Sequence, residues 1–283
     1  MIRRLPFALP FALKDMAAVS LGHGRAVLLG GLNAADTSTA AVSLLDARGA
    51  QSGGLLPGAQ HDAQGTLLAG RVYVFGGGQF SSYTHILSYD PASGRVTEVA
   101  SLPTPTSDAA VAAIAGTAYV VGGYDGERAL DTILAWRPGE RPRIVGLLPY
   151  GLRYAAVAAS GGRLLIAGGS RGEAATTAIL SFDPTTGAVR RVGEMPAPIT
   201  HAASVALGPD VYVLGGRGIA SNSQSAGIVA VDPATGRALR VGALPLALSD
   251  ASALLVDERI WLVGGLSAGR TVPSVLELTP AEG

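Results

Sequence analysis

The sequence has no cysteine among its 283 residues, which excludes disulfide bridges, zinc–thiolate sites and cysteine nucleophiles. It has no excess of charge either, because 21 basic residues balance 21 acidic ones. Genome base composition explains why Lys14 is the only lysine and every other basic residue is arginine. A chain without net positive charge has no electrostatic footprint for nucleic acid or an anionic membrane. No apolar run reaches transmembrane length, so we expect neither as a partner.

Motifs for metals, phosphate groups and covalent catalysis are missing too. The four histidines, His23, His61, His85 and His201, have no metal-ligand spacing. The glycines at residues 76–78 are not followed by a helix whose N-terminus would bind phosphate. No G-x-S-x-G nucleophile elbow occurs. We therefore expect no metal and no cofactor.

The N-terminal segment imitates a short signal peptide, since two arginines precede the apolar residues 5–13. Pro6 and Pro10 interrupt that stretch, and it fits the internal repeat described below. We expect a cytoplasmic monomer. A periplasmic or secreted location would require a signal peptide removed ahead of residue 1.

Glycine, by contrast, is abundant, and six apolar runs end in a glycine pair. The spacings between successive pairs are 46, 46, 46, 47 and 49 residues. A repeat of about 40–50 residues is typical of propeller blades. The pairs are Gly30-Gly31, Gly76-Gly77, Gly122-Gly123, Gly168-Gly169, Gly215-Gly216 and Gly264-Gly265.

Alignment on these glycines predicts four strands, a to d, in each repeat. Strand b is β-branched and apolar on both faces, as in residues 72–75 and 118–121. Strand a before it is rich in small residues, which suits strands that converge on an axis. Strands c and d flank Asp-Pro-x-x-Gly turns such as residues 90–94, where Asp, Pro and Gly each favour a tight connection.

The repeat predicts an all-β fold: a six-bladed β-propeller of four-stranded antiparallel blades in a single domain. The last repeat lacks a strand d, whereas residues 3–10 resemble one. We expect this N-terminal strand to close the ring as the outer strand of the last blade. The predicted blades are residues 11–57, 58–103, 104–149, 150–196, 197–245, and 246–283 together with 1–10.

The repeat resembles the kelch motif over nearly the whole chain. Residues 89–91 (Tyr-Asp-Pro) and 182–184 (Phe-Asp-Pro) carry the resemblance best, with Tyr73, Tyr119 and Tyr212 in strand b. Kelch repeats usually have a tryptophan shortly after this turn. The chain departs from that pattern, with Val96, Val189 and Ala238 there. It looks like a divergent, bacterial-type kelch propeller.

Two kelch enzymes bear on function. Residues 9–10 and 14–18 look similar to the start of bacterial sialic acid mutarotases, but the chain lacks their long loop insertions. That distant resemblance implies no catalytic residue here. Galactose oxidase needs a tyrosine–cysteine crosslink at its copper, and the absence of cysteine excludes that activity.

The candidate site is the rim formed by the d–a and b–c loops around the channel, because propellers bind ligands on such loops. Fifteen and fourteen residues before the glycine pairs stand polar residues, and the sequence leaves open which of each two faces the channel. Asp and Ser there also commonly bond the backbone of a turn, a structural alternative for the acids. These positions are His61-Asp62, Ser107-Asp108, Arg153-Tyr154, Thr200-His201 and Ser249-Asp250, with residues 14–16 near the same level.

The b–c loops add Tyr124 and an arginine in four successive blades, at Arg128, Arg171, Arg217 and Arg270. This set favours an anionic or carbohydrate ligand, and a solvated charged face is the alternative. The predicted ligand-binding residues are Arg153, Tyr154, His201, Asp250, Arg171, Arg217 and Tyr124.

Three functions fit these features. The first is a module that binds a small polar or acidic ligand, or a protein partner, at the channel mouth. The second is a mutarotase or epimerase for a sialic-acid-like sugar, with Asp62 or Asp108 and His201 as candidate acid and base. The third is a structural spacer.

Overall fold

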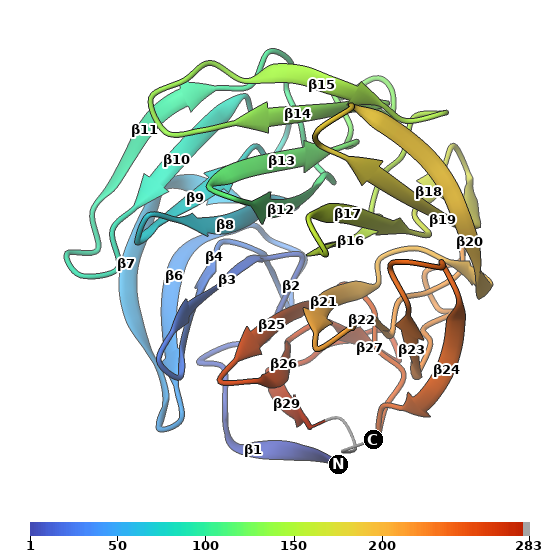
Figure 1. Cartoon of the computed structure of the whole chain (residues 1–283). Coiled ribbons are helices and arrows are strands. Elements are labelled where there is room, and N and C mark those ends of the chain that lie inside the picture. The colour runs from blue at the N-terminus through green and yellow to red at the C-terminus, as the bar shows by residue number, and fades with distance from the viewer. Residues whose placement is uncertain (280–283) are drawn as a thin grey trace.

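The computed structural model of the chain describes residues 1–279 and contains six antiparallel sheets arranged around a central axis (Figure 1). The predicted six-bladed β-propeller is confirmed. The innermost strands of the blades, which run along the axis, are β3 (Ala17–Gly22), β8 (Gln64–Leu68), β12 (Ala110–Ile114), β16 (Ala156–Ser160), β21 (Ala203–Leu207) and β25 (Ser252–Val256). The second strands are β4 (Arg25–Leu29), β9 (Arg71–Phe75), β13 (Thr117–Val121), β17 (Arg163–Ala167), β22 (Asp210–Leu214) and β26 (Arg259–Val263).

The third strands are β6 (Thr39–Asp46), β10 (His85–Tyr89), β14 (Thr132–Trp136), β19 (Ala174–Asp183), β23 (Gly227–Val231) and β29 (Ser274–Leu278). The outer strands are β7 (Gly49–Gln60), β11 (Val96–Ser101), β15 (Arg143–Leu147), β20 (Ala188–Ile199), β24 (Ala238–Ala243) and β1 (Ile2–Ala8). Strands β7 and β20 continue past Pro57 and Pro196, where the sequence predicts those blades to end. Residues 280–283 of the last predicted blade lie outside the described residues.

The N-terminal strand closes the ring as expected. Strand β1 pairs antiparallel with β29, so the sixth blade combines the two ends of the chain. The buried Glu277 of β29 accepts a hydrogen bond from Arg3 Nε of β1 at 2.7 Å and lies 3.2 Å from Arg259 Nη1. Trp261 Nε1 also donates to this carboxylate, at 3.3 Å. Three strands of the closed blade, β1, β26 and β29, therefore meet at one side chain.

Six apolar clusters form the core, one between each pair of neighbouring blades. The second strand of a blade contributes side chains to the clusters on both of its faces. In β9, for example, Val72 and Val74 pack toward the first blade and Tyr73 and Phe75 toward the third. The alternation explains why the sequence shows these strands as continuous apolar runs.

Each glycine pair joins its blade to the next one. The first glycine has a positive φ, and a Cβ on it would overlap a carbonyl oxygen of the segment that leads from the outer strand of its blade into the next blade. At Gly122 that oxygen belongs to Leu152, and the Gly123 amide donates to the same oxygen at 2.9 Å. The equivalent bond recurs at all six blade junctions. A side chain would push the blades apart, so only glycine fits.

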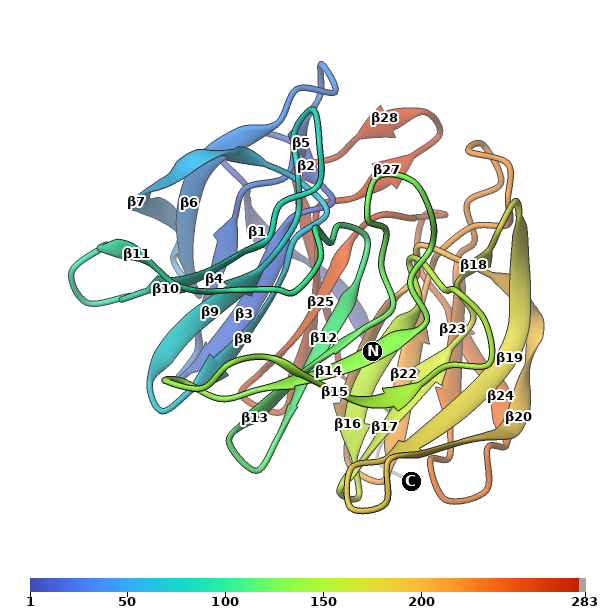
Figure 2. The ribbon, with the colours of Figure 1, turned by 90° about the horizontal axis from the view of Figure 1, so that it is seen from above.

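Short strands stand on one face of the disk, where the b–c loops rise above the inner strands (Figure 2). They are β2 (Leu13–Lys14), β5 (Leu32–Asn33), β18 (Ser170–Arg171), β27 (Leu266–Ser267) and β28 (Arg270–Thr271). No helix in the described part of the chain is long and apolar enough to cross a membrane.

Candidate functional site

A closed ring of backbone hydrogen bonds surrounds the channel where the inner strands begin. One residue of each blade, just before its innermost strand, donates its amide to the carbonyl of its counterpart in the preceding blade, at 2.9–3.2 Å. All six have a φ between 52° and 58°, the left-handed region. We call them the ring residues: Asp15, Asp62, Asp108, Tyr154, His201 and Asp250.

The structure shows which member of each predicted pair faces the channel. The second member of each predicted pair lines the channel, and all six ring residues border the central cavity. Aspartate tolerates the left-handed backbone better than most residues, so the backbone gives these acids a structural role. Tyr154 and His201 hold the same conformation, however. The backbone therefore does not require four carboxyl groups here.

The four carboxyl groups lie in two neighbouring pairs, Asp62 with Asp108 and Asp15 with Asp250, close enough for the charge of one to act on the other. Burial, and then the charges of neighbouring acids, raise the pKa of Asp62 and of Asp15 well above the usual range. Both effects favour the protonated form of these two side chains over the carboxylate.

Arg153 neutralises the first pair. Its Nε donates to Asp108 Oδ2 at 2.6 Å, and its Nη2 contacts the same oxygen. The guanidinium also lies over the Tyr124 ring, 4.0 Å from the ring centre, and Nη2 is 3.4 Å from the Tyr154 hydroxyl. Arg153, which the sequence predicts to bind the ligand, is therefore already paired with Asp108.

Arg217 has the corresponding position beside the second pair. Its Nη2 donates to His201 Nε2 at 3.0 Å, and its Nε lies 3.9 Å from Asp250 Oδ2. Burial, and then the charges of Arg217 and Arg153, lower the pKa of His201 to about 3. The imidazole is therefore neutral, and with Nε2 accepting from Arg217 its Nδ1 hydrogen faces Thr200 Oγ1 at 3.1 Å. Its ring stacks on Tyr154, with the centres 3.7 Å apart.

One donor in this cluster has no acceptor. The Nε atom of Arg217 is buried, and no described residue lies within hydrogen-bond distance of it. Buried charged N–H groups in folded proteins nearly always have a partner. The unpaired donor points to an acceptor that the protein itself does not supply.

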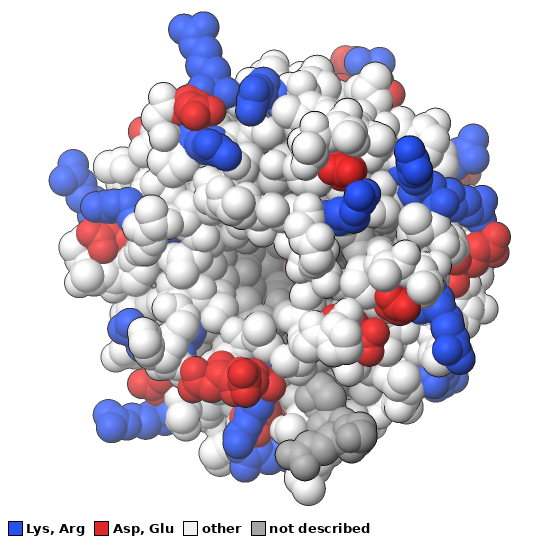
Figure 3. All heavy atoms as spheres, viewed as in Figure 1, with Lys and Arg blue, Asp and Glu red and all other residues white. Residues whose placement is uncertain are grey.

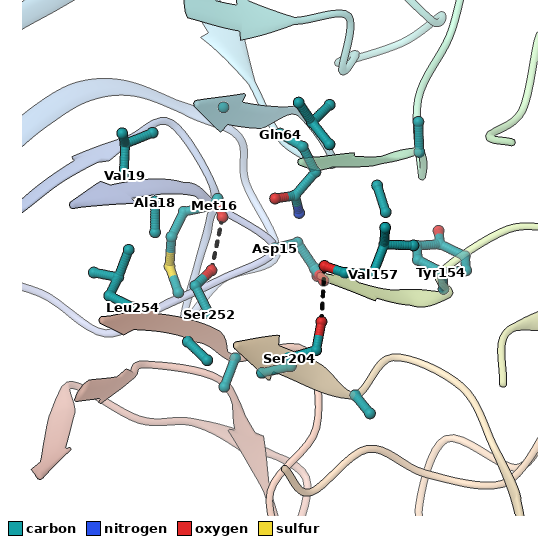
Figure 4. Close-up of a pocket in the computed structure, with 18 of the residues that line it drawn as sticks. Asp15, Met16, Ala18, Val19, Gln64, Tyr154, Val157, Ser204, Ser252 and Leu254 are labelled. Atoms are coloured by element: carbon teal, nitrogen blue, oxygen red, sulfur yellow. Dashed lines mark hydrogen bonds between the residues drawn. The ribbon is translucent and has the colours of Figure 1, made fainter. Parts of the chain in front are cut away.

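The central cavity below the ring has a volume of about 350 Å³, inside the range of small-molecule sites, about 300–1,000 Å³. Figure 4 shows Asp15, Gln64 and Tyr154 around it. Two hydroxyls in its wall bridge neighbouring inner strands, Ser204 to the Val157 carbonyl at 3.0 Å and Ser252 to that of Met16 at 2.9 Å. Figure 3 shows the opposite face of the disk, away from the b–c loops, and the centre of that face is hollowed too, with an uncharged border.

Most predicted site residues meet at the ring, where Arg153 and Arg217 contact ring residues. Arg171 does not: it lies over the Tyr150 ring, 4.7 Å from its centre. The sequence places Asp15 near the same level without assigning it a role. Its blade carries one extra residue, accommodated by a register shift between Ser20 and Gly22, so Asp15 falls outside the 14-residue spacing of the other five.

Within residues 1–279, no group of three or more His, Cys, Asp or Glu side chains is arranged to hold a metal ion. Two of the ring carboxyls lie beside arginines, Asp108 beside Arg153 and Asp250 beside Arg217.

Comparisons with known proteins agree with the architecture. The kelch motif matches residues 105–140 and 151–196. The solved structure of YjhT superimposes with a TM-score of 0.86 at 17% sequence identity, over 98% of this chain and 97% of that one. No curated protein sequence matches the chain significantly. The matched motifs, the six repeats and the ring closure show that the chain is a six-bladed β-propeller that contains kelch motifs.

Proposed function

We propose that the channel mouth binds a small polyhydroxylated ligand of the monosaccharide class. Kelch propellers are binding modules for ligands or protein partners, and here the observation that carries the proposal is the composition of the ring. Burial raises the pKa values of Asp62 and Asp15, so that these carboxyl groups can donate beside neighbouring groups that accept, which is what adjacent sugar hydroxyls need. Arg217 Nε adds a buried donor without an acceptor.

Stability alone does not account for this arrangement. Taking carboxyl groups out of water costs free energy unless they are fully paired. Asparagine would hold the same left-handed backbone and donate to a neighbouring carboxylate without that cost. Four acids in one ring therefore favour a role in binding, since destabilising groups persist where function requires them.

A thermal-shift screen of monosaccharides tests the proposal. We expect at least one sugar to raise the melting temperature of the wild type, and Arg217→Gln to weaken its binding about tenfold or more, because a hydrogen bond to a charged group contributes about 1.5–3 kcal/mol. Arg171→Gln is the matched control, since it removes the same charge from a loop residue that lies over Tyr150 and not beside the ring residues. If no sugar binds, or both variants bind equally well, the proposal is wrong.

The alternative activity is mutarotation of a sialic-acid-like sugar, and the carboxyl pairs favour it. Exchange of anomers needs a general acid and a general base, and burial raises the pKa of Asp62, which suits this residue to the role of the acid beside Asp108. His201 is a weaker candidate than the sequence suggests, because its Nε2 accepts from Arg217 and its pKa is lowered to about 3. Freshly dissolved α-N-acetylneuraminic acid should then equilibrate faster with wild type than with Asp62→Asn. A rate equal to that in buffer excludes this activity.

A protein partner is the other occupant that the rim suits. Phe80 and Ile219, in b–c loops of the same face, have exposed fractions of 96% and 52%. Exposed apolar side chains on loops are common anchors for partners. A screen in which no small molecule binds would direct attention to these two residues.

A further inference from the structure

The single lysine of the chain stands at the channel mouth. Lys14 immediately precedes the ring residue Asp15, and only 14% of its side chain is exposed. Every other residue counted as basic is an arginine. The one lysine is adjacent in sequence to a residue of the candidate site. An ammonium is a compact point charge with three donors, and it fits a narrow space where a planar guanidinium would not.

The partner of Lys14 comes from its own b–c loop. Asp36 Oδ1 lies 2.6 Å from Lys14 Nζ, and 72% of the Asp36 side chain is exposed. The loop is held by Asn33, whose side chain accepts hydrogen bonds from the Ala35 and Thr37 amides at 2.8 and 3.1 Å. The exposed Asp36 carboxylate is thus paired with the Lys14 ammonium, which is mostly buried.

We propose that Lys14 is the anion subsite of the channel mouth, and that the Asp36 carboxylate occupies the position that a carboxylate of the ligand takes on binding. This inference rests on the proposed function and narrows it to ligands that carry a carboxylate beside their hydroxyls. Under this proposal the Lys14–Asp36 pair, which is not part of the ring, selects ligands that carry a carboxylate.

The exchange of one carboxylate for another costs little. An ion pair with an exposed partner contributes at most about 1 kcal/mol, so Asp36 leaves easily. The incoming carboxylate restores the same charge next to Lys14, and Asp36 moves into water. A ligand without an anion must instead bind with the Lys14–Asp36 pair intact.

The neighbouring acids select among anions. Asp15 and Asp250 lie close enough for the charge of Lys14 to act on both. A phosphate monoester carries up to two negative charges at pH 7 and would face these carboxyl groups with more repulsion than a carboxylate does. The subsite should therefore prefer a carboxylate to a phosphate.

Because Lys14 is the only lysine, its amine can be followed by NMR as a single lysine signal. Reductive methylation with 13C-formaldehyde labels the Lys14 amine as the only lysine signal and preserves its charge. Glucuronate, N-acetylneuraminate, the methyl esters of both acids and glucose 6-phosphate are titrated into wild type and Asp36→Asn. We expect the free acids to shift the Lys14 signal and the esters to leave it in place. Asp36→Asn should bind the acids about two- to fivefold more tightly, because the competing carboxylate is gone.

Matched variants separate this subsite from the ring. Lys14→Gln should weaken binding of the acids about tenfold or more and leave the esters unaffected, whereas Arg270→Gln, an equal charge change in a neighbouring exposed loop, should alter neither. If no acid moves the Lys14 signal even in Asp36→Asn, or if acid and ester move it equally, the subsite is wrong. Binding of the acids that depends on Arg217 but not on Lys14 would overturn this inference alone. If no sugar binds in a way that depends on Arg217, the proposed function is wrong.

Discussion

At the scale of single residues, the ring residues share one backbone conformation but carry three kinds of side chain: carboxyl groups, a phenol and an imidazole. The repeat predicts that residues before the inner strands face the channel, and the structure bears this out for the second of each pair. The sequence does not distinguish the two members, because a left-handed residue breaks the in-out alternation of a strand. The pairing of carboxyls across blades is equally hidden, since it joins residues about one repeat apart.

The acids of the ring should reduce stability at neutral pH. The native pKa of Asp62 lies above its ordinary value of 3.8, so the native state keeps a proton that the unfolded chain releases. Stability therefore falls as the pH rises from about 4 toward the raised native pKa. We expect Asp62→Asn to unfold at higher denaturant concentration than wild type at pH 7, by on the order of 1–3 kcal/mol.

Denaturant titrations between pH 4 and pH 8 check this expectation. The advantage of Asp62→Asn should shrink toward pH 4, where both states of the wild type hold the proton. Asp131→Asn, at an exposed position, is the control and should change stability little at any pH. A variant that is less stable than wild type at pH 7 would show that the carboxyl pair stabilises the ring.

At the scale of elements, the glycine pairs are junctions between blades. Their constant spacing predicts the blade count, and their apolar runs predict the second strands. The contact with a carbonyl of the segment that leads into the next blade was not predictable, because it depends on how two blades approach each other. Propensity misleads at the inner strands, where alanine, a poor strand former, is common because six strands converge on the axis.

Gly122→Ala tests the junction. Its Cβ would overlap the Leu152 carbonyl oxygen, in addition to the strain of a φ of 61°. Gly116→Ala is the matched control, because Gly116 has a φ of 76° and nothing within 4 Å of the added atom. The control should lose about 1–2 kcal/mol from backbone strain alone, and Gly122→Ala clearly more, about 3 kcal/mol or above. Equal losses in urea unfolding would mean that the close approach of the blades is unimportant.

At the scale of the whole molecule, stability depends on closing the ring. The missing outer strand of the last repeat and the strand-like N-terminus predict the closure that β1 and β29 make. The ion pairs that hold this blade were not predictable, since Glu277 joins residues from opposite ends of the chain. Function is the least predictable property, because one fold serves many ligands and the loops alone differ.

Glu277→Gln should weaken the closure. Despite its burial, hydrogen bonds from Arg3 and Trp261 hold the pKa of Glu277 below its ordinary value of 4.5. Its contribution is therefore present above about pH 4.5 and lost as the pH falls through the lowered native pKa. We expect a loss of about 2 kcal/mol at pH 7 and a smaller difference from wild type near pH 3, measured by thermal unfolding. A difference that does not depend on pH would exclude a role for the charge.

The central claim is that buried carboxyl groups of the ring stay protonated above their usual pH range and take part in binding a polyhydroxylated ligand. Carboxyl 13C NMR of protein labelled at aspartate tests it most directly, with Asp15→Asn and Asp62→Asn as assignment variants. We predict that the signals of these two residues titrate well above pH 4 and shift when a sugar identified by the thermal-shift screen is added. Carboxyl groups that all titrate near pH 4, and signals that no sugar moves, would contradict the account.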